Sequence, residues 1–328
     1  MGSFTNFPNG ITSLGVPTFG TGFIPPFPSN YIFVEEVAGA GVLYGQGTAQ
    51  QPFNTLGQAL AQCPASGSNN VIFLTGTVHL TAPLVWSNSN VHLVGLCPSV
   101  RRGKRARISV SGATPFGPLV SVTGSGCIFQ NFGTFFGFST TGATSPICWQ
   151  DTGGHNYYSL VEFLGFGDQT ASTGTANQTG ARALKFNTST GETTFSSCVF
   201  GVDTEQRGAT NYTVEVAGGA PRVTFEDCDF EADIGSGGTS GSHLLIGSAG
   251  IDRYMNINRC RFLNSTKSGA SAMAQAFNVS ASAGGVVLLD QSTFFGITAI
   301  ETTPSASVYM NMAPANTGGG LAKETPGT

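Results

Sequence analysis

The sequence predicts an all-β fold, a solenoid in which short parallel strands stack coil upon coil, and three observations lead to this prediction. Only 32 of the 328 residues are charged (14 basic and 18 acidic), so the chain lacks many of the residues that favour long helices. Its 46 glycines and 16 prolines mark frequent turns. A short apolar motif recurs every 30 to 37 residues, which is the period expected for one solenoid coil.

Residues 1–30 are predicted to form an extended docking arm. The segment carries no charge and is interrupted by prolines and glycines, so we expect no regular self-pairing of its strands. An apolar arm without a core of its own exposes its side chains to water unless it docks on another surface. The residues assigned to this docking are Phe4, Phe7, Ile11, Leu14, Val16, Phe19 and Phe23.

The solenoid domain is predicted over residues 31–312, with one short helix near its start. Phe53, Leu56, Ala59 and Leu60 recur at helical spacing, which predicts a helix near residues 52–62. We expect this helix to cap the open end of the solenoid. Residues 313–328 are Gly-rich and polar, and they are predicted to be a C-terminal tail.

A basic run follows the first predicted coil and holds five of the 14 basic residues in seven positions. It has no aromatic interleaving and no basic companion elsewhere, so a nucleic-acid site is not predicted. Two interpretations stay open, a solvated loop or an electrostatic contact with an acidic surface of a partner. The residues of this basic contact loop are Arg101, Arg102, Lys104, Arg105 and Arg107.

The recurring motif has an apolar residue, then a small residue three positions later, then Phe two positions after that. The small-residue positions are 127, 161, 198, 228, 260 and 292, separated by 34, 37, 30, 32 and 32 residues. Residues two apart in a strand share a face, so stacking in register predicts two internal columns. One column holds Cys198, Cys228 and Cys260, and the other holds Phe163, Phe200, Phe230, Phe262 and Phe294.

Neither the cysteines nor the histidines indicate a cofactor or metal site. The seven cysteines include no C-x-x-C pair, which argues against a zinc site and a disulfide framework. They are interpreted as reduced, buried thiols. The four histidines share no metal-ligand spacing, and no nucleotide-binding or nucleophile motif occurs.

The strongest catalytic candidate is an acidic cluster at Glu226, Asp227, Asp229, Glu231 and Asp233. Asp229 and Glu231 alternate with the buried motif residues, so a solvated outer face explains them. The predicted register places Glu162 and Asp229 in one outward column, two coils apart, and we interpret this as too far for a tight catalytic pair. The sequence therefore predicts no catalytic and no metal-binding residue.

The arm also carries a resemblance to a known family. Asn6–Ser13 reads N-F-P-N-G-I-T-S, and similar motifs begin a family of tailed-bacteriophage virion proteins. The segments 31–34, 45–56 and 71–78 resemble the opening of right-handed parallel β-helix proteins of the pectate-lyase-like type. The resemblance covers residues 4 to 311 and implies a right-handed parallel β-helix.

The resemblance implies a non-enzymatic virion structural protein that decorates or cements the capsid. Its partners would be the major capsid protein and further copies of itself, with a homotrimer expected by analogy with other capsid decorations. No cofactor, nucleic acid or membrane partner is predicted, and the expected location is the virion, assembled in the host cytoplasm. The alternative is a tail fibre or tailspike that binds or depolymerises host-surface glycans.

Overall fold

The computed structural model describes the solenoid and short pieces of both termini. The described residues are 12–13, 16–17, 30–36, 45–65, 69–111, 114–165, 178–187, 191–207, 210–265, 271–280, 285–301, 308–310 and 322–323.

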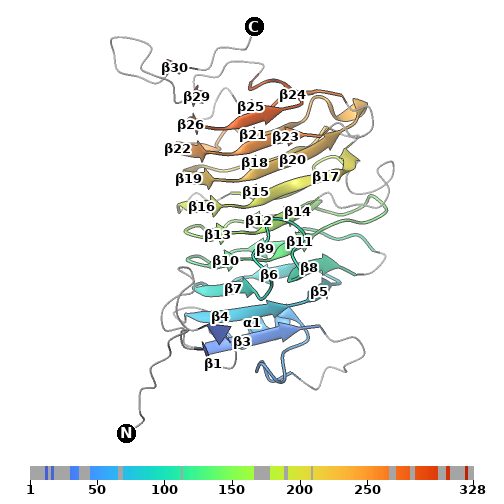
Figure 1. Cartoon of the computed structure of the whole chain (residues 1–328), viewed down its shortest axis with the longest axis vertical. Coiled ribbons are helices and arrows are strands. Elements are labelled where there is room, and N and C mark those ends of the chain that lie inside the picture. Colours follow the sequence, from blue (N-terminus) through green and yellow to red (C-terminus); the bar gives the residue numbers. More distant parts are fainter. Residues whose placement is uncertain are drawn as a thin grey trace.

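The chain forms a right-handed parallel β-helix, as the sequence predicted. Figure 1 shows the coils stacked along the long axis, from β3 at one end to β26 and β25 at the other. Each coil runs through a strand of sheet 1, then sheet 2, then sheet 3, and neighbouring coils pair in parallel. Because the solenoid pairs each strand with the coils on either side, its backbone hydrogen bonds are satisfied along the stack.

The strands fall into three long sheets. Sheet 1 contains β3 (Asn30–Glu35), β4 (Asn70–Thr75), β7 (Val91–Gly95), β10 (Ile128–Gln130), β13 (Tyr157–Ser159), β16 (Thr193–Ser196), β19 (Ala220–Glu226), β22 (Ile251–Asn258), β26 (Val286–Asp290), β29 (Val308–Met310) and the antiparallel β30 (Ala322–Lys323). Sheet 2 contains β5 (Thr77–Leu80), β8 (Arg107–Val110), β11 (Gly133–Phe135), β14 (Glu162–Leu164), β17 (Val199–Arg207), β20 (Asp229–Ile234), β23 (Arg261–Asn264) and β27 (Thr293–Phe295). Sheet 3 contains β6 (Leu84–Trp86), β9 (Val120–Val122), β12 (Ile147–Asp151), β15 (Arg182–Phe186), β18 (Tyr212–Val216), β21 (Ser242–Ile246) and β25 (Phe277–Val279). Outside them lie the pair β1 (Thr12–Ser13) and β2 (Val16–Pro17), the pair β24 (Met273–Gln275) and β28 (Ile297–Ala299), and a 3₁₀ turn at Ser236–Gly238.

Helix α1 (Leu56–Ala61) is shorter than the predicted span of 52–62. Thr55 caps it, and Gln58 completes a capping box by accepting the Thr55 backbone N–H through its side chain. Phe53 precedes the helix and forms a β-bridge with Val34 instead. Leu56 is fully buried beside the first coil, so the helix covers the apolar interior next to β3.

The recurring motif is a corner between two strands and not a single strand. In one coil, Phe195 belongs to β16, Cys198 lies at the corner and Phe200 belongs to β17. The intervening Ser197 has a φ of 55°, in the left-handed region that few non-glycine residues adopt. The same position has positive φ in six coils, at Asn131, Leu160, Ser197, Asp227, Arg259 and Gln291.

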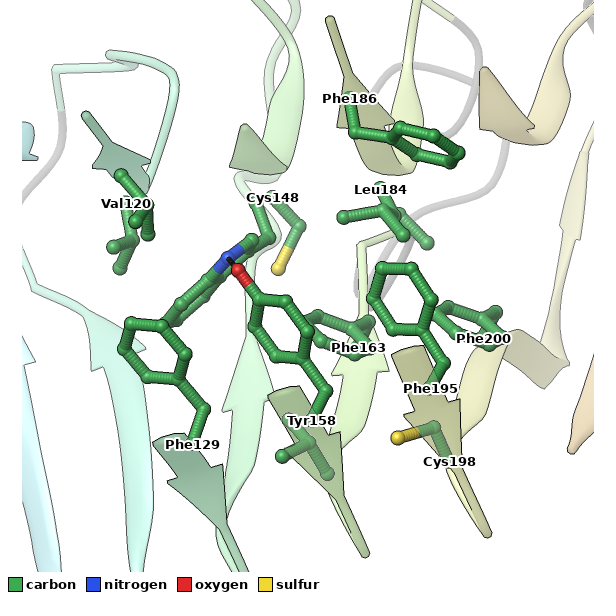
Figure 2. Close-up of a cluster of buried hydrophobic side chains, with 14 of the residues drawn as sticks. Val120, Phe129, Cys148, Tyr158, Phe163, Leu184, Phe186, Phe195, Cys198 and Phe200 are labelled. Carbon is green, nitrogen blue, oxygen red and sulfur yellow. Dashed lines mark hydrogen bonds between the residues drawn. The ribbon is translucent and has the colours of Figure 1, made fainter. Parts of the chain in front are cut away.

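The interior holds the two columns that the motif defines. Cys198, Cys228 and Cys260 are essentially fully buried. The phenylalanine rings stack in sequence, with centroids 5.1 Å apart between Phe163 and Phe200, and 4.5 Å apart between Phe230 and Phe262. Figure 2 shows Phe163 and Phe200 side by side, with further aromatic rings pointing into the same interior. Phe294 continues the column but is only partly buried, because β27 is the last strand of sheet 2.

The arm and the tail lie almost wholly outside the described residues. This holds for the docking residues Phe4, Phe7, Ile11, Leu14, Phe19 and Phe23, while Val16 is described only as part of β2. The antiparallel pairing of β1 with β2 departs from the expectation that the arm has no self-pairing, since two residues on each side do pair. Within the described part of the chain, no helix is long and apolar enough to cross a membrane.

Candidate functional site

Charged side chains gather on the outer face of sheet 2 and at its corner with sheet 1. This group contains 13 of the 32 charged residues of a sparsely charged chain. The basic members are Arg101, Arg102, Lys104, Arg105, Arg107, Arg259 and Arg261, and the acidic members are Glu162, Asp203, Glu226, Asp227, Asp229 and Glu231.

The basic run lies in an insertion at one corner of the solenoid. Two residues, 197 and 198, join β16 to β17, whereas residues 96–106 join β7 to β8. We call residues 96–106 the strap. The Asn131 side chain fastens its beginning by donating to the carbonyl oxygens of Gly95 (3.1 Å) and Cys97 (2.8 Å). From there the strap extends over later coils as far as β20.

The tip of the strap binds acidic residues of the same chain. Arg101 donates from Nε to Asp229 Oδ2 at 2.7 Å and from a terminal nitrogen to the Asp227 carbonyl oxygen. Arg102 pairs with Glu231, and the Lys104 backbone N–H donates to Glu162 Oε2 at 3.3 Å.

These contacts give the basic run a role that neither of its two interpretations named. The acidic surface that it meets belongs to the chain itself, which the sequence analysis did not anticipate. Charged residues separated by 58 to 129 positions are brought together because the solenoid places β14 and β20 on the face that the strap crosses. Arg105 stays exposed, and Arg107 begins β8 and donates to the Lys104 carbonyl oxygen at 3.2 Å.

Asp229 is the centre of the cluster. It is fully buried although it points away from the solenoid interior, and Arg261 grips it with two hydrogen bonds of 2.6 Å. Together with Arg101, two guanidinium groups neutralise this one carboxylate.

The interpretation of this acidic segment as a solvated face is wrong for its central members. Asp229 and Glu231 are 0% and 3% exposed, because the strap lies against them. Glu226 and Asp227 do remain near the surface, with about two fifths of each side chain exposed, and both pair with Arg259.

The predicted register of the outward column is confirmed. Glu162 pairs with Val199, Val199 with Asp229, Asp229 with Arg261, and Arg261 with Thr293. The backbones of Glu162 and Asp229 are therefore two strand spacings apart, which is about 9.5 Å. Carboxyl groups about 6.5–9.5 Å apart suit an inverting hydrolysis, in which a water molecule fits between the substrate and the base. The backbone spacing of two coils therefore does not by itself exclude a catalytic pair on this face.

The surroundings of Glu162 and Asp227 shift the pKa values of their carboxyl groups in opposite directions. Burial raises the pKa of the Glu162 carboxyl, and the nearby Lys104 backbone N–H and ammonium only partly oppose this. Its Oε1 atom has no hydrogen-bond partner among the described residues. Hydrogen bonds from Arg259 hold the pKa of the Asp227 carboxyl below its usual range. A raised pKa suits Glu162 better than Asp227 to carry a proton.

The described residues contain no group of three or more His, Cys, Asp or Glu side chains placed to hold a metal ion. The sequence analysis recognised the basic run and the acidic cluster separately but did not join them. The signal that could have joined them is their complementary charge in a chain where charge is otherwise rare.

Comparisons with known proteins place the fold and leave the activity open. No protein-family model matches the chain, and no curated protein matches it in sequence. Among solved structures, the chain resembles the pectin methylesterase of Aspergillus niger, with a TM-score of 0.53 and 15% identity over 87% of this chain and 85% of that one. It also resembles a pectin methylesterase solved in complex with a hexasaccharide, with a TM-score of 0.51 and 14% identity over 89% of this chain and 84% of that one.

These likenesses correct one prediction. The sequence analysis predicted that the chain is not an enzyme, but its fold is shared with carbohydrate-active enzymes, so that prediction is wrong. At 14–15% identity the likeness shows the parallel β-helix fold alone. Capsid docking and virion location stay predictions from the arm motif, and trimer formation stays a prediction by analogy with other capsid decorations.

Proposed function

We propose that the chain is a β-helix protein that binds a glycan and hydrolyses it at the charged cluster of sheet 2. The observation that carries the proposal is Asp229, a fully buried carboxylate on the outside of the solenoid, in one column with Glu162, whose pKa is raised by burial. A carboxylate with a purely structural role at the surface would add little stability when buried in this way, because taking a carboxylate out of water is costly.

The two carboxyl groups suit different steps of one hydrolysis. Glu162, with its raised pKa, is assigned as the general acid that protonates the leaving oxygen. Asp229 is assigned as the base that takes a proton from the attacking water, and Arg261 positions it through two hydrogen bonds. Val199 lies between them and offers an apolar floor to the reacting centre.

A glycan is the substrate class that the fold supports best. Two neighbours in fold are pectin methylesterases, and one of them was solved with a bound hexasaccharide. Parallel strands repeat about every 4.8 Å along a solenoid, so the flat outer face offers a linear polymer a regular series of positions. The tail-fibre or tailspike alternative is the form of this proposal in which the glycan lies on a host surface.

The test is a screen of purified full-length protein against polysaccharides, read by release of reducing ends and of methanol or acetate. New reducing ends indicate glycosidic cleavage, whereas methanol or acetate indicates ester hydrolysis. Asp229→Asn and Glu162→Gln should each lower the rate at least about 100-fold, since each removes an acid–base group.

Asp227→Asn is the matched control, because Asp227 lies two residues from Asp229 but pairs with Arg259 at the surface. Its rate should stay within about twofold of the wild type. Unchanged hydrolysis by Asp229→Asn would place the active site elsewhere on the solenoid.

A further inference from the structure

We propose that the strap is a displaceable cover over Glu162, Asp229 and Glu231, and that an anionic glycan opens it by binding Arg101 and Arg102. This inference rests on the proposed function, since it names how that site is reached and which class of glycan reaches it. Three features of the strap support this inference: the contacts that hold it on β20, the state of the residues that it uncovers on opening, and the side chains that it exposes to solvent.

Polar contacts hold the strap down, and apolar burial contributes little at its tip. Its larger apolar side chains face water, with Leu96 38% and Val100 46% exposed. The contacts across to β20 are ion pairs, of Arg101 with Asp229 and of Arg102 with Glu231 and, at 3.8 Å, with Asp229. Lifting the tip therefore exchanges ion pairs for hydration, and Val199 is the apolar side chain that it uncovers between Glu162 and Asp229.

Opening also leaves neither Asp229 nor Glu231 buried without a partner. Asp229 keeps both hydrogen bonds from Arg261, because that residue belongs to β23 and not to the strap. The side chain of Glu231 loses Arg102 but gains water on the same outer face. The ends of the strap stay fixed, one by Asn131 and the other by entry into β8.

The strap presents its cations, and not the carboxylates, to an approaching ligand. The side chains of Arg101 and Arg102 are 37% and 46% exposed, whereas those of their partners Asp229 and Glu231 are 0% and 4% exposed. A guanidinium is a planar fork that binds carboxylate and sulfate groups with two hydrogen bonds. An anionic sugar can therefore compete for both arginines before it meets the acids beneath.

The experiment is carboxyl footprinting of the full chain with a water-soluble carbodiimide and an amine, read residue by residue by mass spectrometry. In the free protein Asp229 should label at least tenfold more slowly than Asp252, whose side chain is 59% exposed. Arg101→Ala combined with Arg102→Ala should raise the labelling rate of Asp229 at least tenfold. Arg105→Ala, in the same strap but exposed, is the matched control and should leave that rate unchanged.

The ligand arm uses wild-type protein, so it does not depend on how the double variant folds. Dextran sulfate should raise the labelling of Asp229, and neutral dextran of the same chain length should not. The double variant should bind dextran sulfate at least tenfold more weakly than Arg105→Ala does.

Equal labelling of Asp229 with and without dextran sulfate, or in the double variant and the wild type, would overturn the inference. Footprinting needs no turnover. An opening strap without hydrolysis would therefore refute the proposed function alone, and hydrolysis without strap opening would refute the cover alone.

Discussion

Strand β20 buries residues on both of its faces, and the two faces are buried in different ways. Phe230 points inward, where its ring lies 5.0 Å from that of Phe200 and 4.5 Å from that of Phe262 in the coils on either side. Asp229 and Glu231 point outward and are buried by a strap that lies more than 120 residues earlier in the chain.

The two faces of β20 differ in whether their buried side chains can become exposed while the protein stays folded. Stacked rings cannot separate without exposing apolar surface along the whole solenoid, so the inner face is fixed. The outer face is closed by half-exposed arginines that regain water when they leave, so its burial is reversible. Asp229, Phe230 and Glu231 are consecutive, yet the burial of Phe230 is permanent and that of the two acids is reversible.

The largest expected effect comes from the inner face. Phe230→Ala should destabilise the protein by roughly 3–5 kcal/mol, because it leaves a cavity in a close-packed ring column. Urea denaturation followed by circular dichroism measures this. Phe295→Ala is the matched control: its ring is 63% exposed on the same sheet, and its cost should be below about 0.5 kcal/mol. Equal losses of stability in Phe230→Ala and Phe295→Ala would show that the phenylalanine column adds no more stability than an exposed ring does.

A smaller change on the inner side tests the thiol column. Cys228→Ser should cost roughly 1–3 kcal/mol, since it places a hydroxyl among apolar neighbours. Burial also raises the pKa of the Cys228 thiol well above its usual value, so thiol reagents should label it only after unfolding. Cys97, which is partly exposed, provides the comparison within the same protein. Rapid labelling of Cys228 in the native state would contradict its inward position.

On the outer face, Asp229→Asn should cost roughly 1–2 kcal/mol, because Arg101 and Arg261 lose a charged acceptor but remain half exposed to water. Asp227→Asn should cost less than about 1 kcal/mol, since its pair with Arg259 is open to solvent. Thermal unfolding of both variants in one buffer gives the comparison. A larger loss from Asp227→Asn would place the centre of the cluster at the corner.

The smallest effects lie in the pH dependence of stability, and the two acids should differ in sign. The folded-state pKa of Glu162 is raised, so the native state binds the extra proton and stability falls as pH rises from the usual Glu value through the raised one. The folded-state pKa of Asp227 is lowered, so its contribution is present above the usual Asp value and is lost as pH falls through the lowered one.

The free energy of unfolding, measured across the acidic range for Glu162→Gln and Asp227→Asn, checks both signs. Glu162→Gln should remove the fall above the usual Glu value, and Asp227→Asn should remove the loss at the acid end. If the free energy of unfolding depended on pH in the same way in both variants, opposite pKa shifts in Glu162 and Asp227 would be contradicted.

The fold could be predicted because its determinants repeat. Cys198, Cys228 and Cys260 recur about once per coil, and a residue in register one coil away is also one period away in sequence. The same register correctly placed Glu162, Val199 and Asp229 in one column. The helix was found but set too long, since Phe53 fits helical spacing and yet pairs with the strand that contains Val34.

The site could not be predicted because it has no period. The strap is an insertion in one coil, and the sequence of residues 96–106 does not indicate which coil its tip contacts. Asp229 alternates with Phe230 as a solvated residue would, so periodicity alone cannot tell a covered outer face from an open one. Only the match between a basic run and an acidic run carried that information.

The most direct test of the account is a single glycan-hydrolysis assay on four proteins: the wild type, Asp229→Asn, the double variant Arg101→Ala with Arg102→Ala, and Arg105→Ala. With a neutral substrate, Asp229→Asn should lose activity at least about 100-fold. The double variant should gain in kcat/KM because its carboxylates are uncovered, and Arg105→Ala should match the wild type. Full activity in Asp229→Asn, or loss of activity in the double variant together with Arg105→Ala, would contradict a catalytic carboxylate under a displaceable cover.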